Sequence, residues 1–370
     1  MALIKNKKYY SVEQILKLGA SYNMIFGERS NGKTYATLYK GLERYFEEGK
    51  QIAYIRRYRD DIKGRNGGTL FNTFIHNGNG ENVIKKLSKG KWDDVYYYSG
   101  RYFFRKTQED GSFITDNKEF AYSFSINTSE HYKSNSYPFI GTIVFDEFIP
   151  IDGVGLPDEF MLFMNLLSTI IRDPSRTDVL VFMVANTINW DSPYFKEFGL
   201  NNIRNMKQGT IDFYRYGDSN TSLAVEYCQN NVSKESKEND RFFAFDNPHL
   251  KMITEGTWEM DLYPHCPCYY SPKDVLFKYF IHYNDDLLQA DVVFQENKYF
   301  TYIHKKTGEV KFPDEDIIFT NLEHSPQYNI RTNLFRPEDR LGQRLLKFYK
   351  DNKVFYQDNV VGQIIDNYKA

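Results

Sequence analysis

The chain has 370 residues, of which 41% are hydrophobic and 26% charged, as expected for a globular protein of one large or two ordinary domains. The 47 Lys and Arg residues nearly balance the 49 Asp and Glu residues, so no global basic excess indicates nucleic-acid binding. Three cysteines exclude a disulfide framework, and we find neither an apolar run of about 18 residues nor a secretory signal. We therefore expect a soluble, intracellular protein without a membrane partner.

The strongest motif follows a short predicted strand at residues 22–26. Residues 27–34, Gly-Glu-Arg-Ser-Asn-Gly-Lys-Thr, match the phosphate-binding loop pattern G-x-x-x-x-G-K-[ST] at every fixed position. The two glycines allow the backbone to turn tightly and approach an anion. Apolar residues then recur at helical spacing from residue 34 to 46, so strand, loop and helix follow in the order that the motif requires. This context disfavours a chance match in a glycine-containing turn.

Each residue type in this loop has a chemical role. Lys33 is expected to reach the β- and γ-phosphates of a nucleotide, and Thr34 to supply a hydroxyl to Mg²⁺. Backbone N–H groups of the loop are expected to surround the phosphate oxygens. The predicted nucleotide-binding residues of this segment are Gly27, Glu28, Arg29, Ser30, Asn31, Gly32, Lys33, Thr34 and Tyr35.

The next segments extend the predicted sheet. Residues 51–57 predict a second core strand, and residues 64–80, rich in Gly and Asn, predict a loop. From residue 94 to 126, aromatic runs alternate with turn signals such as Ser99-Gly100. This pattern predicts an antiparallel meander appended to the core sheet.

A second motif lies at residues 141–147, where an apolar run ends in Asp146 and Glu147. A buried parallel strand has this pattern, and its acids emerge at the carboxyl edge of the sheet. Asp146 is expected to hold Mg²⁺, and Glu147 to orient and polarise an attacking water. The alternative is an ordinary strand followed by an exposed acidic turn.

Residues 158–171 predict an amphipathic helix, followed by Arg172 and Arg176. Either arginine is a candidate to act on a neighbouring subunit's phosphate site as an arginine finger. The alternative for Arg172 is a cation that complements the helix dipole. Residues 178–185 predict another buried strand, which ends at Asn186, a candidate γ-phosphate sensor or a simple turn residue. Because strands alternate with helices, we expect an α/β fold with a mainly parallel sheet.

The carboxyl-terminal part has a different pattern. We place an ATPase domain at 1–208, a linker or lid at 209–245 and an α+β domain at 246–370. In the last domain we expect strands at 275–282, 287–294, 298–304 and 317–320 and helices at 341–348 and 360–368. The Cys266-Pro267-Cys268 segment lacks a second pair at zinc-site spacing, so we interpret it as structural. No acidic cluster indicates a two-metal nuclease, and we expect no nuclease activity.

The loop at 27–34 with its internal Arg29, the strand ending in Asp146-Glu147, and Val184-Ala185-Asn186 together resemble viral genome-packaging ATPases. The similarity is greatest to the DNA encapsidation ATPases of phi29-like small tailed phages, which are related to large terminases, and covers about residues 1–205. The resemblance implies an ATPase domain of the additional-strand, catalytic-glutamate type joined to a degenerate RNase H-like nuclease domain.

The same resemblance implies a motor. Subunits of this family form a homo-oligomeric ring, commonly a pentamer, at the portal of a procapsid in the host cytoplasm, in some cases with a packaging RNA. ATP hydrolysis with Mg²⁺ drives double-stranded DNA through the ring. On this basis Glu147, Lys33, Arg172 and Arg176 are the candidate catalytic residues, and Thr34 and Asp146 the metal ligands.

Other functions share the phosphate loop. A nucleotide kinase, a regulatory switch or a helicase-like ATPase would also bind a nucleotide here. Glu147 beside Asp146 favours hydrolysis over phosphoryl transfer to a small acceptor. No set of helicase motifs follows Asn186, and no arginine-rich lid of a kinase is identifiable.

Overall fold

The computed structural model describes residues 9–28, 31–76, 80–149, 155–173, 175–186, 192–200, 202–217, 221–228, 263–266, 268–321, 330–331, 333–337 and 339–369. The chain divides into two compact units, and the described residues up to 228 belong to the first and those from 263 to the second. In the described ranges, no helix combines the length and the apolar character needed to cross a membrane.

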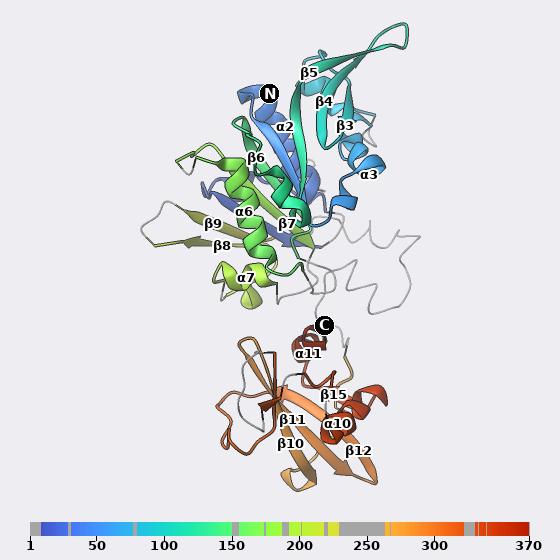
Figure 1. Cartoon of the computed structure of the whole chain (residues 1–370), viewed down its shortest axis with the longest axis vertical. Coiled ribbons are helices and arrows are strands. Elements are labelled where there is room, and N and C mark those ends of the chain that lie inside the picture. The colour runs from blue at the N-terminus through green and yellow to red at the C-terminus, as the bar shows by residue number, and fades with distance from the viewer. Residues whose placement is uncertain are drawn as a thin grey trace. The chain divides into compact units, whose positions relative to one another are not determined.

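A nine-stranded sheet forms the first unit, in the order β3-β4-β5-β2-β6-β7-β1-β9-β8. The six strands from β5 to β9 in this order pair in parallel, while β3, β4 and β8 add antiparallel pairs at the edges (Figure 1). The strands are β1 (Tyr22–Gly27), β2 (Gln51–Arg56), β3 (Asp94–Tyr98), β4 (Arg101–Thr107), β5 (Phe113–Ser125), β6 (Ile140–Asp146), β7 (Leu180–Asn186), β8 (Thr210–Arg215) and β9 (Ser222–Tyr227).

Helices connect these strands. The long ones are α2 (Lys33–Glu48), which follows β1, and α6 (Glu159–Ile171), between β6 and β7. The short ones are α1 (Glu13–Leu16), η1 (Arg59–Asp61), α3 (Gly64–Gly68), α4 (Asn72–Ile75), α5 (Val83–Leu87), η2 (Ile126–Tyr132), α7 (Pro193–Glu197) and η3 (Ile203–Asn205). The mainly parallel α/β architecture and the meander at 94–126 are thus confirmed.

Both faces of the sheet are buried because successive strand residues point to opposite sides. On β6, Ile143 and Phe145 pack into the core beneath α6, whereas Val144 packs into the core beneath α2. The interior parallel strands are therefore apolar at nearly every position, which explains why their sequences lack an alternating pattern.

Two sequence predictions need correction. The first domain does not end at residue 208, because β8 and β9 complete its sheet and β9 pairs in parallel with β1. The part of the predicted linker at 229–245 and the predicted domain boundary at 246 lie outside the described residues. The segment 64–80 is not a plain loop, since α3 and α4 form there and bury Phe71 and Phe74.

The second unit contains a six-stranded sheet in the order β14-β13-β10-β11-β12-β15. A meander of β10 (Val275–Tyr283), β11 (Asp286–Gln295) and β12 (Lys298–Lys305) is antiparallel, whereas β13 (Ile318–Thr320), β14 (Ile330–Arg331) and β15 (Val354–Tyr356) join in parallel pairs. The helical elements are η4 (Pro272–Asp274), α10 (Arg340–Lys350) and α11 (Asn359–Lys369). The strands and helices predicted in this part are confirmed.

The buried carboxylate of Asp291 in this unit raises the pKa of a neighbouring histidine, His304. The His304 Nε2 lies 3.7 Å from Asp291 Oδ2, and this interaction raises the pKa of His304 above its usual value of about 6.5. The pair therefore stabilises the fold fully at pH values below about 6.5, and this stabilisation is lost as the pH rises through the raised pKa of His304. NMR titration of His304 in the full chain should give a raised pKa that falls in Asp291→Asn. An unchanged titration in that variant would contradict the assignment.

Candidate active site

The phosphate-loop backbone lies between β1 and the start of α2. At Gly27 a Cβ atom would lie 2.3 Å from Cys228 Sγ, so only glycine fits against this neighbour. Gly32 has φ of 89°, a left-handed conformation that glycine adopts without strain, and directly precedes Lys33, the first residue of α2. The predicted loop residues Arg29 and Ser30 lie outside the described residues.

Lys33 is buried against the loop itself. Its Nζ donates to the carbonyl oxygens of Gly27 at 3.0 Å and Glu28 at 2.6 Å, and to Asn31 Oδ1 at 3.2 Å. Burial lowers the pKa of the Lys33 ammonium below its usual value. The lysine thus places a poorly solvated cation inside the loop, where an anion would interact with it strongly.

Thr34 and Asp146 are in direct contact. The Thr34 hydroxyl donates to Asp146 Oδ1 at 3.0 Å, and the Tyr54 hydroxyl donates to Asp146 Oδ2 at 3.0 Å. Burial raises the pKa of Asp146, and the nearby Arg56 and the two hydroxyl donors oppose that rise. A threonine hydroxyl and a carboxylate are oxygen ligands of the kind that Mg²⁺ prefers, and Mg²⁺ sites commonly use only one or two carboxylates. The pair therefore fits a magnesium site.

Glu147 follows Asp146 with a left-handed backbone, at φ of 57°. Arg56 donates to Glu147 Oε2 at 2.7 Å, and the side chain of Glu147 remains 40% exposed. This carboxylate is therefore oriented by an ion pair and accessible to water, as a group that polarises water requires.

A buried arginine, Arg57, hydrogen-bonds to the backbone at Glu147 and Phe148. Arg57 donates to the carbonyl oxygens of Glu147 at 3.1 Å and Phe148 at 2.9 Å. The same guanidinium forms an ion pair with Glu159 of α6, at 2.6 Å, and Tyr194 donates to Glu159 at 2.9 Å. Arg57 is 7% exposed and Glu159 3%, so this charged network belongs to the core and fixes the turn that carries Glu147.

A cavity of about 220 Å³ joins these groups. It lies at the carboxyl ends of β1, β6 and β7, where Asn186 of β7 is in register with Gly27 of β1. The cavity unites ten residues, eight of which are predicted site residues: Asn31, Gly32, Lys33, Thr34, Tyr35, Asp146, Glu147 and Asn186. Glu28 is buried beside the loop and accepts a hydrogen bond from Gln208 at 3.2 Å.

The structure does not bring Arg172 and Arg176 to this cavity within one chain. Arg176 donates to the carbonyl of Ile140 at 2.6 Å and pairs with Asp178 at 3.0 Å. Ile140 and Asp146 are the two ends of β6, about 20 Å apart at roughly 3.3 Å per residue. Arg172 is exposed and donates to the carbonyls of Lys133 and Asn135 at 2.9 and 2.8 Å. Both arginines therefore lie far from their own phosphate loop.

Sequence reasoning missed several residues of the site. Tyr54, Cys228 and the pair Arg57–Glu159 have no local pattern that marks them. Arg56 lies near the end of a predicted strand, but its partner Glu147 is 91 residues away in the sequence. Assigning alternate residues of β2 to opposite faces of the sheet would have separated Tyr54 from Ile55.

The contact at Gly27 gives a direct prediction. Gly27→Ala should weaken nucleotide binding and destabilise the chain by about 1–3 kcal/mol, because the new methyl group overlaps Cys228. Fluorescence titration with a labelled nucleotide and thermal unfolding would measure both effects. Gly308→Ala is the control, since its Cβ meets no atom within 4 Å. Equal behaviour of the two variants would contradict the prediction.

The chain is similar to known DNA packaging proteins of phages. A family model for podovirus DNA encapsidation proteins (Gp16) matches residues 4–214. The DNA packaging protein of Bacillus phage B103 is 29% identical over 180 residues, covering 48% of this chain and 48% of that protein. That of Bacillus phage phi29 is 26% identical over 194 residues, covering 52% and 50%. The chain thus spans about half the length of the curated relatives it matches.

The fold has a solved counterpart. A chain from the bacteriophage phi29 viral genome packaging motor assembly matches with a TM-score of 0.56 at 20% identity, covering 97% of both chains. Because the family model covers more than half of the 370 residues, the chain belongs to the family of podovirus DNA encapsidation proteins.

Proposed function

We propose that this protein is the ATP-hydrolysing subunit of a motor that moves double-stranded DNA into a viral procapsid. The observation that carries the proposal is the single cavity in which Lys33, Thr34, Asp146 and Glu147 meet. Membership of the DNA encapsidation family and the fold similarity to a phi29 motor chain support the packaging role.

ATP binding would use the loop and the start of α2. The buried ammonium of Lys33 now donates to two loop carbonyls. If a phosphate oxygen replaced one of these carbonyls as acceptor, the hydrogen bond of Lys33 would become stronger, because the new acceptor is charged. Thr34 and Asp146 would hold Mg²⁺, which supplies neutralisation of phosphate charge. Asn186, at the end of β7, would contact the γ-phosphate side of the nucleotide.

Hydrolysis would depend on the position of Glu147. Its carboxylate would accept a proton from the attacking water or orient that water in line with the γ-phosphate. Arg56 sets the direction of the carboxylate, and Arg57 holds the backbone from which it extends. These two arginines are therefore positioning residues of the proposed reaction.

An arginine from a neighbouring subunit would complete the site. We propose Arg172 for this role in preference to Arg176, because Arg172 is exposed and makes no ion pair among the described residues. Arg176 is paired with Asp178, so its use as a finger would require that pair to break. A homo-oligomeric ring, such as a pentamer at the capsid portal in the host cytoplasm, would provide this geometry. A packaging RNA is a further partner of the proposed ring.

We propose that the second unit has an RNase H-like origin and lacks nuclease activity. The strand order supports this origin, because the meander β10–β11–β12 is extended in parallel beyond β10 by β13 and β14. Neither β10 nor β13 contains an acidic residue, and the described residues contain no group of three or more His, Cys, Asp or Glu suited to a metal ion. A two-metal nuclease needs such a group.

The test is steady-state ATP hydrolysis with Mg²⁺, measured with and without double-stranded DNA, alongside the mass of the assembly in solution. We expect hydrolysis that rises with double-stranded DNA and with ring formation. A monomer whose hydrolysis ignores DNA, or that phosphorylates a nucleoside, would instead support the alternative of another phosphate-loop enzyme or switch.

A further inference from the structure

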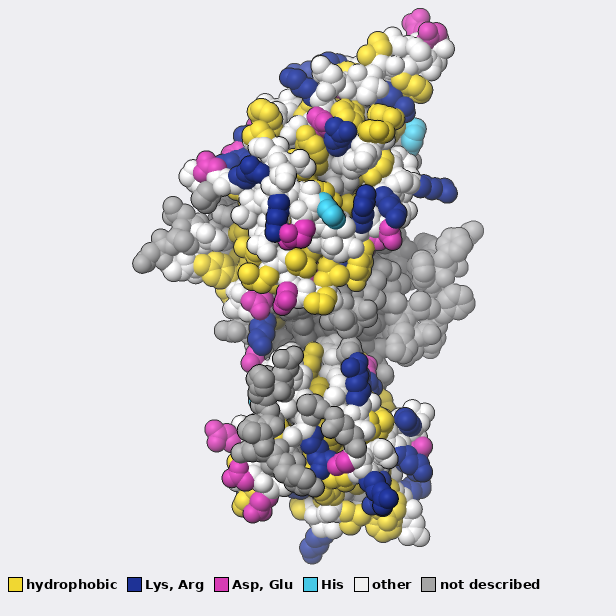
Figure 2. Space-filling model, in the orientation of Figure 1, with side chains coloured by type: hydrophobic (Ala, Val, Ile, Leu, Met, Phe, Trp, Pro, Cys, Tyr) yellow, Lys and Arg dark blue, Asp and Glu magenta, His cyan; other side chains and the backbone are white. Residues whose placement is uncertain are grey.

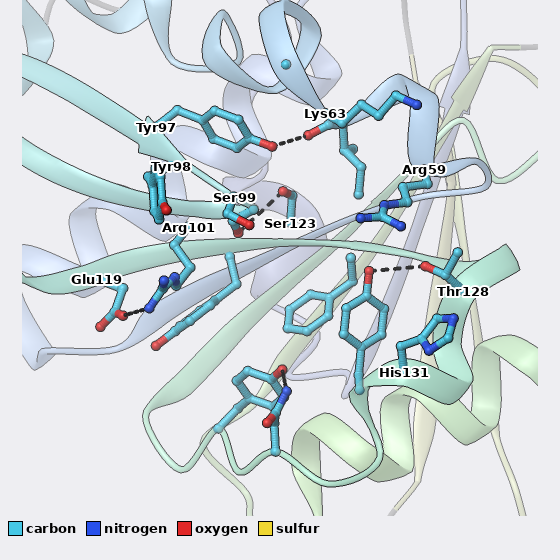
Figure 3. A pocket seen from close by; sticks show the side chains of 18 of the residues that line it. Arg59, Lys63, Tyr97, Tyr98, Ser99, Arg101, Glu119, Ser123, Thr128 and His131 are labelled. Atoms are coloured by element: carbon cyan, nitrogen blue, oxygen red, sulfur yellow. Dashed lines mark hydrogen bonds and ion pairs between the residues drawn. The ribbon is translucent and has the colours of Figure 1, made fainter.

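A second cavity, of about 880 Å³, lies in the first unit and shares no residue with the site around Lys33. Its walls come from η1 and the start of α3, the turn between β3 and β4, the strand β5, and the segment from η2 to residue 137 (Figure 3). Neither the sequence motifs nor the proposed hydrolysis uses this cavity.

Tyrosine is the commonest residue type in the lining of this cavity. Five tyrosines contribute to it: Tyr97, Tyr98, Tyr122, Tyr132 and Tyr137. Tyr98 is 56% exposed, although its strand β3 belongs to the sheet. Arg101 lies over the Tyr98 ring, 5.9 Å from its centre, so a flat group stacked on this ring would also lie near a cation.

The cavity also carries positive charge. Its lining includes Arg59, Lys63 and Arg101, one carboxylate, Glu119, and His131. Arg101 pairs with Glu119 at 3.3 Å and Lys63 pairs with Asp60. Within the described part of the chain, the backbone of Arg59 bonds to Asn127 and Ile62, but its guanidinium makes no hydrogen bond or ion pair. This exposed guanidinium is therefore available to bind an anion.

The arrangement of these groups suits alternating aromatic and phosphate contacts. Figure 3 shows Arg59 and Arg101 on opposite sides of the cavity, with Tyr98 beside Arg101. Figure 2 shows basic, acidic and hydrophobic side chains interspersed on the visible face of the first unit. Stacked rings combined with cations that follow a backbone are the contacts that bind single-stranded nucleic acid.

We propose that this cavity binds unpaired nucleotides of a single-stranded nucleic acid, with a base stacked on Tyr98 and a phosphate on Arg59. The cavity has the volume of a cube about 10 Å on a side. The major groove of B-DNA alone is roughly 12 Å wide, and the whole duplex is wider still. A duplex therefore does not fit into the cavity. Paired bases would also hide the faces that the tyrosines need. The inference does not rest on the proposed hydrolysis.

The test is fluorescence anisotropy of a labelled ten-nucleotide oligothymidylate with the full chain, without ATP or Mg²⁺. Tyr98→Leu should weaken binding by about 5- to 100-fold through loss of stacking. Arg59→Gln should weaken it about tenfold and lower the slope of log affinity against log salt by about 0.7. A duplex of the same length should be insensitive to Tyr98→Leu.

Matched controls lie close to both positions. Tyr96 is on the same strand and 40% exposed, and Arg65 is an exposed arginine of α3; neither lines the cavity. Tyr96→Leu and Arg65→Gln should bind the oligonucleotide within about twofold of wild type. Thermal unfolding verifies that each variant folds.

Two results would overturn the proposal. One is that the oligonucleotide fails to bind the wild-type chain, and the other is that it binds Tyr98→Leu and Arg59→Gln as tightly as the controls. If in the second case both variants also lose self-association, the surface is a contact between subunits.

Discussion

Glu147→Gln should lower the rate constant of ATP hydrolysis by about 10²- to 10⁴-fold while leaving nucleotide affinity within a few-fold of wild type. The amide keeps the volume of the side chain and retains an oxygen for Arg56, whose guanidinium now donates at 2.7 Å. It loses the negative charge that attracts a proton from water, so the effect falls on the chemical step rather than on binding.

Single-turnover hydrolysis and a separate nucleotide-binding titration would distinguish these effects. Glu43→Gln is the matched control, since Glu43 forms a surface pair with Lys40 at 3.2 Å outside the site and its loss should change neither quantity. Hydrolysis by Glu147→Gln within tenfold of wild type would remove Glu147 from the proposed mechanism.

Glu159→Leu should destabilise the chain by about 3–5 kcal/mol, because it leaves the buried Arg57 without its counter-charge. Tyr194 also loses its acceptor in this variant. For a unit of this size, the loss corresponds to a fall in melting temperature of roughly 6–20 °C.

The double variant Arg57→Met/Glu159→Leu separates stability from positioning. Removing both charges should restore much of the lost stability, since an apolar pair of similar volume replaces a buried ion pair at little cost. Hydrolysis by the double variant should nevertheless be slower than in wild type, because the carbonyls of Glu147 and Phe148 lose the donors that hold the turn.

Thermal unfolding and hydrolysis of both variants test this argument. Glu81→Leu is the control, because Glu81 is an exposed partner of Lys86 and should contribute less than about 1 kcal/mol. If Glu159→Leu has the same melting temperature as this control, the buried network does not stabilise the fold. If the double variant hydrolyses ATP at the wild-type rate, Arg57 does not position Glu147.

Much of the core was predictable because its patterns are local. The phosphate loop at 27–34 is contiguous, and its fixed glycines, lysine and threonine each have a role that depends on neighbouring backbone. The strand ending at Asp146 is an uninterrupted apolar run, which in a protein of this length indicates a buried parallel strand. Parallel strands present their carboxyl ends at one edge, so the meeting of these two motifs also followed from the sequence.

The end of the first domain was not predictable in the same way. Residues 209–228 follow a weakening of the periodic signal, and β8 is only half-buried at the sheet edge. Only strand pairing assigns these residues to the first unit, since β9 pairs with β1 and brings Cys228 against Gly27. The short helices α3 and α4 formed in a segment rich in glycine because tertiary burial of Phe71 and Phe74 outweighed low helix propensity.

By itself, the sequence determined the mainly parallel α/β class, the identity of the phosphate loop, and the acids Asp146 and Glu147 that meet it. The tertiary structure alone decided which groups surround those acids: Arg56 reaches Glu147 across 91 residues, and Arg57 reaches Glu159 across 102. Such contacts depend on the order of strands in the sheet and on which face each side chain occupies. Local sequence patterns show the period of a strand but not which strand lies beside it, so the partners of a candidate catalytic group emerge only when the sheet is assembled.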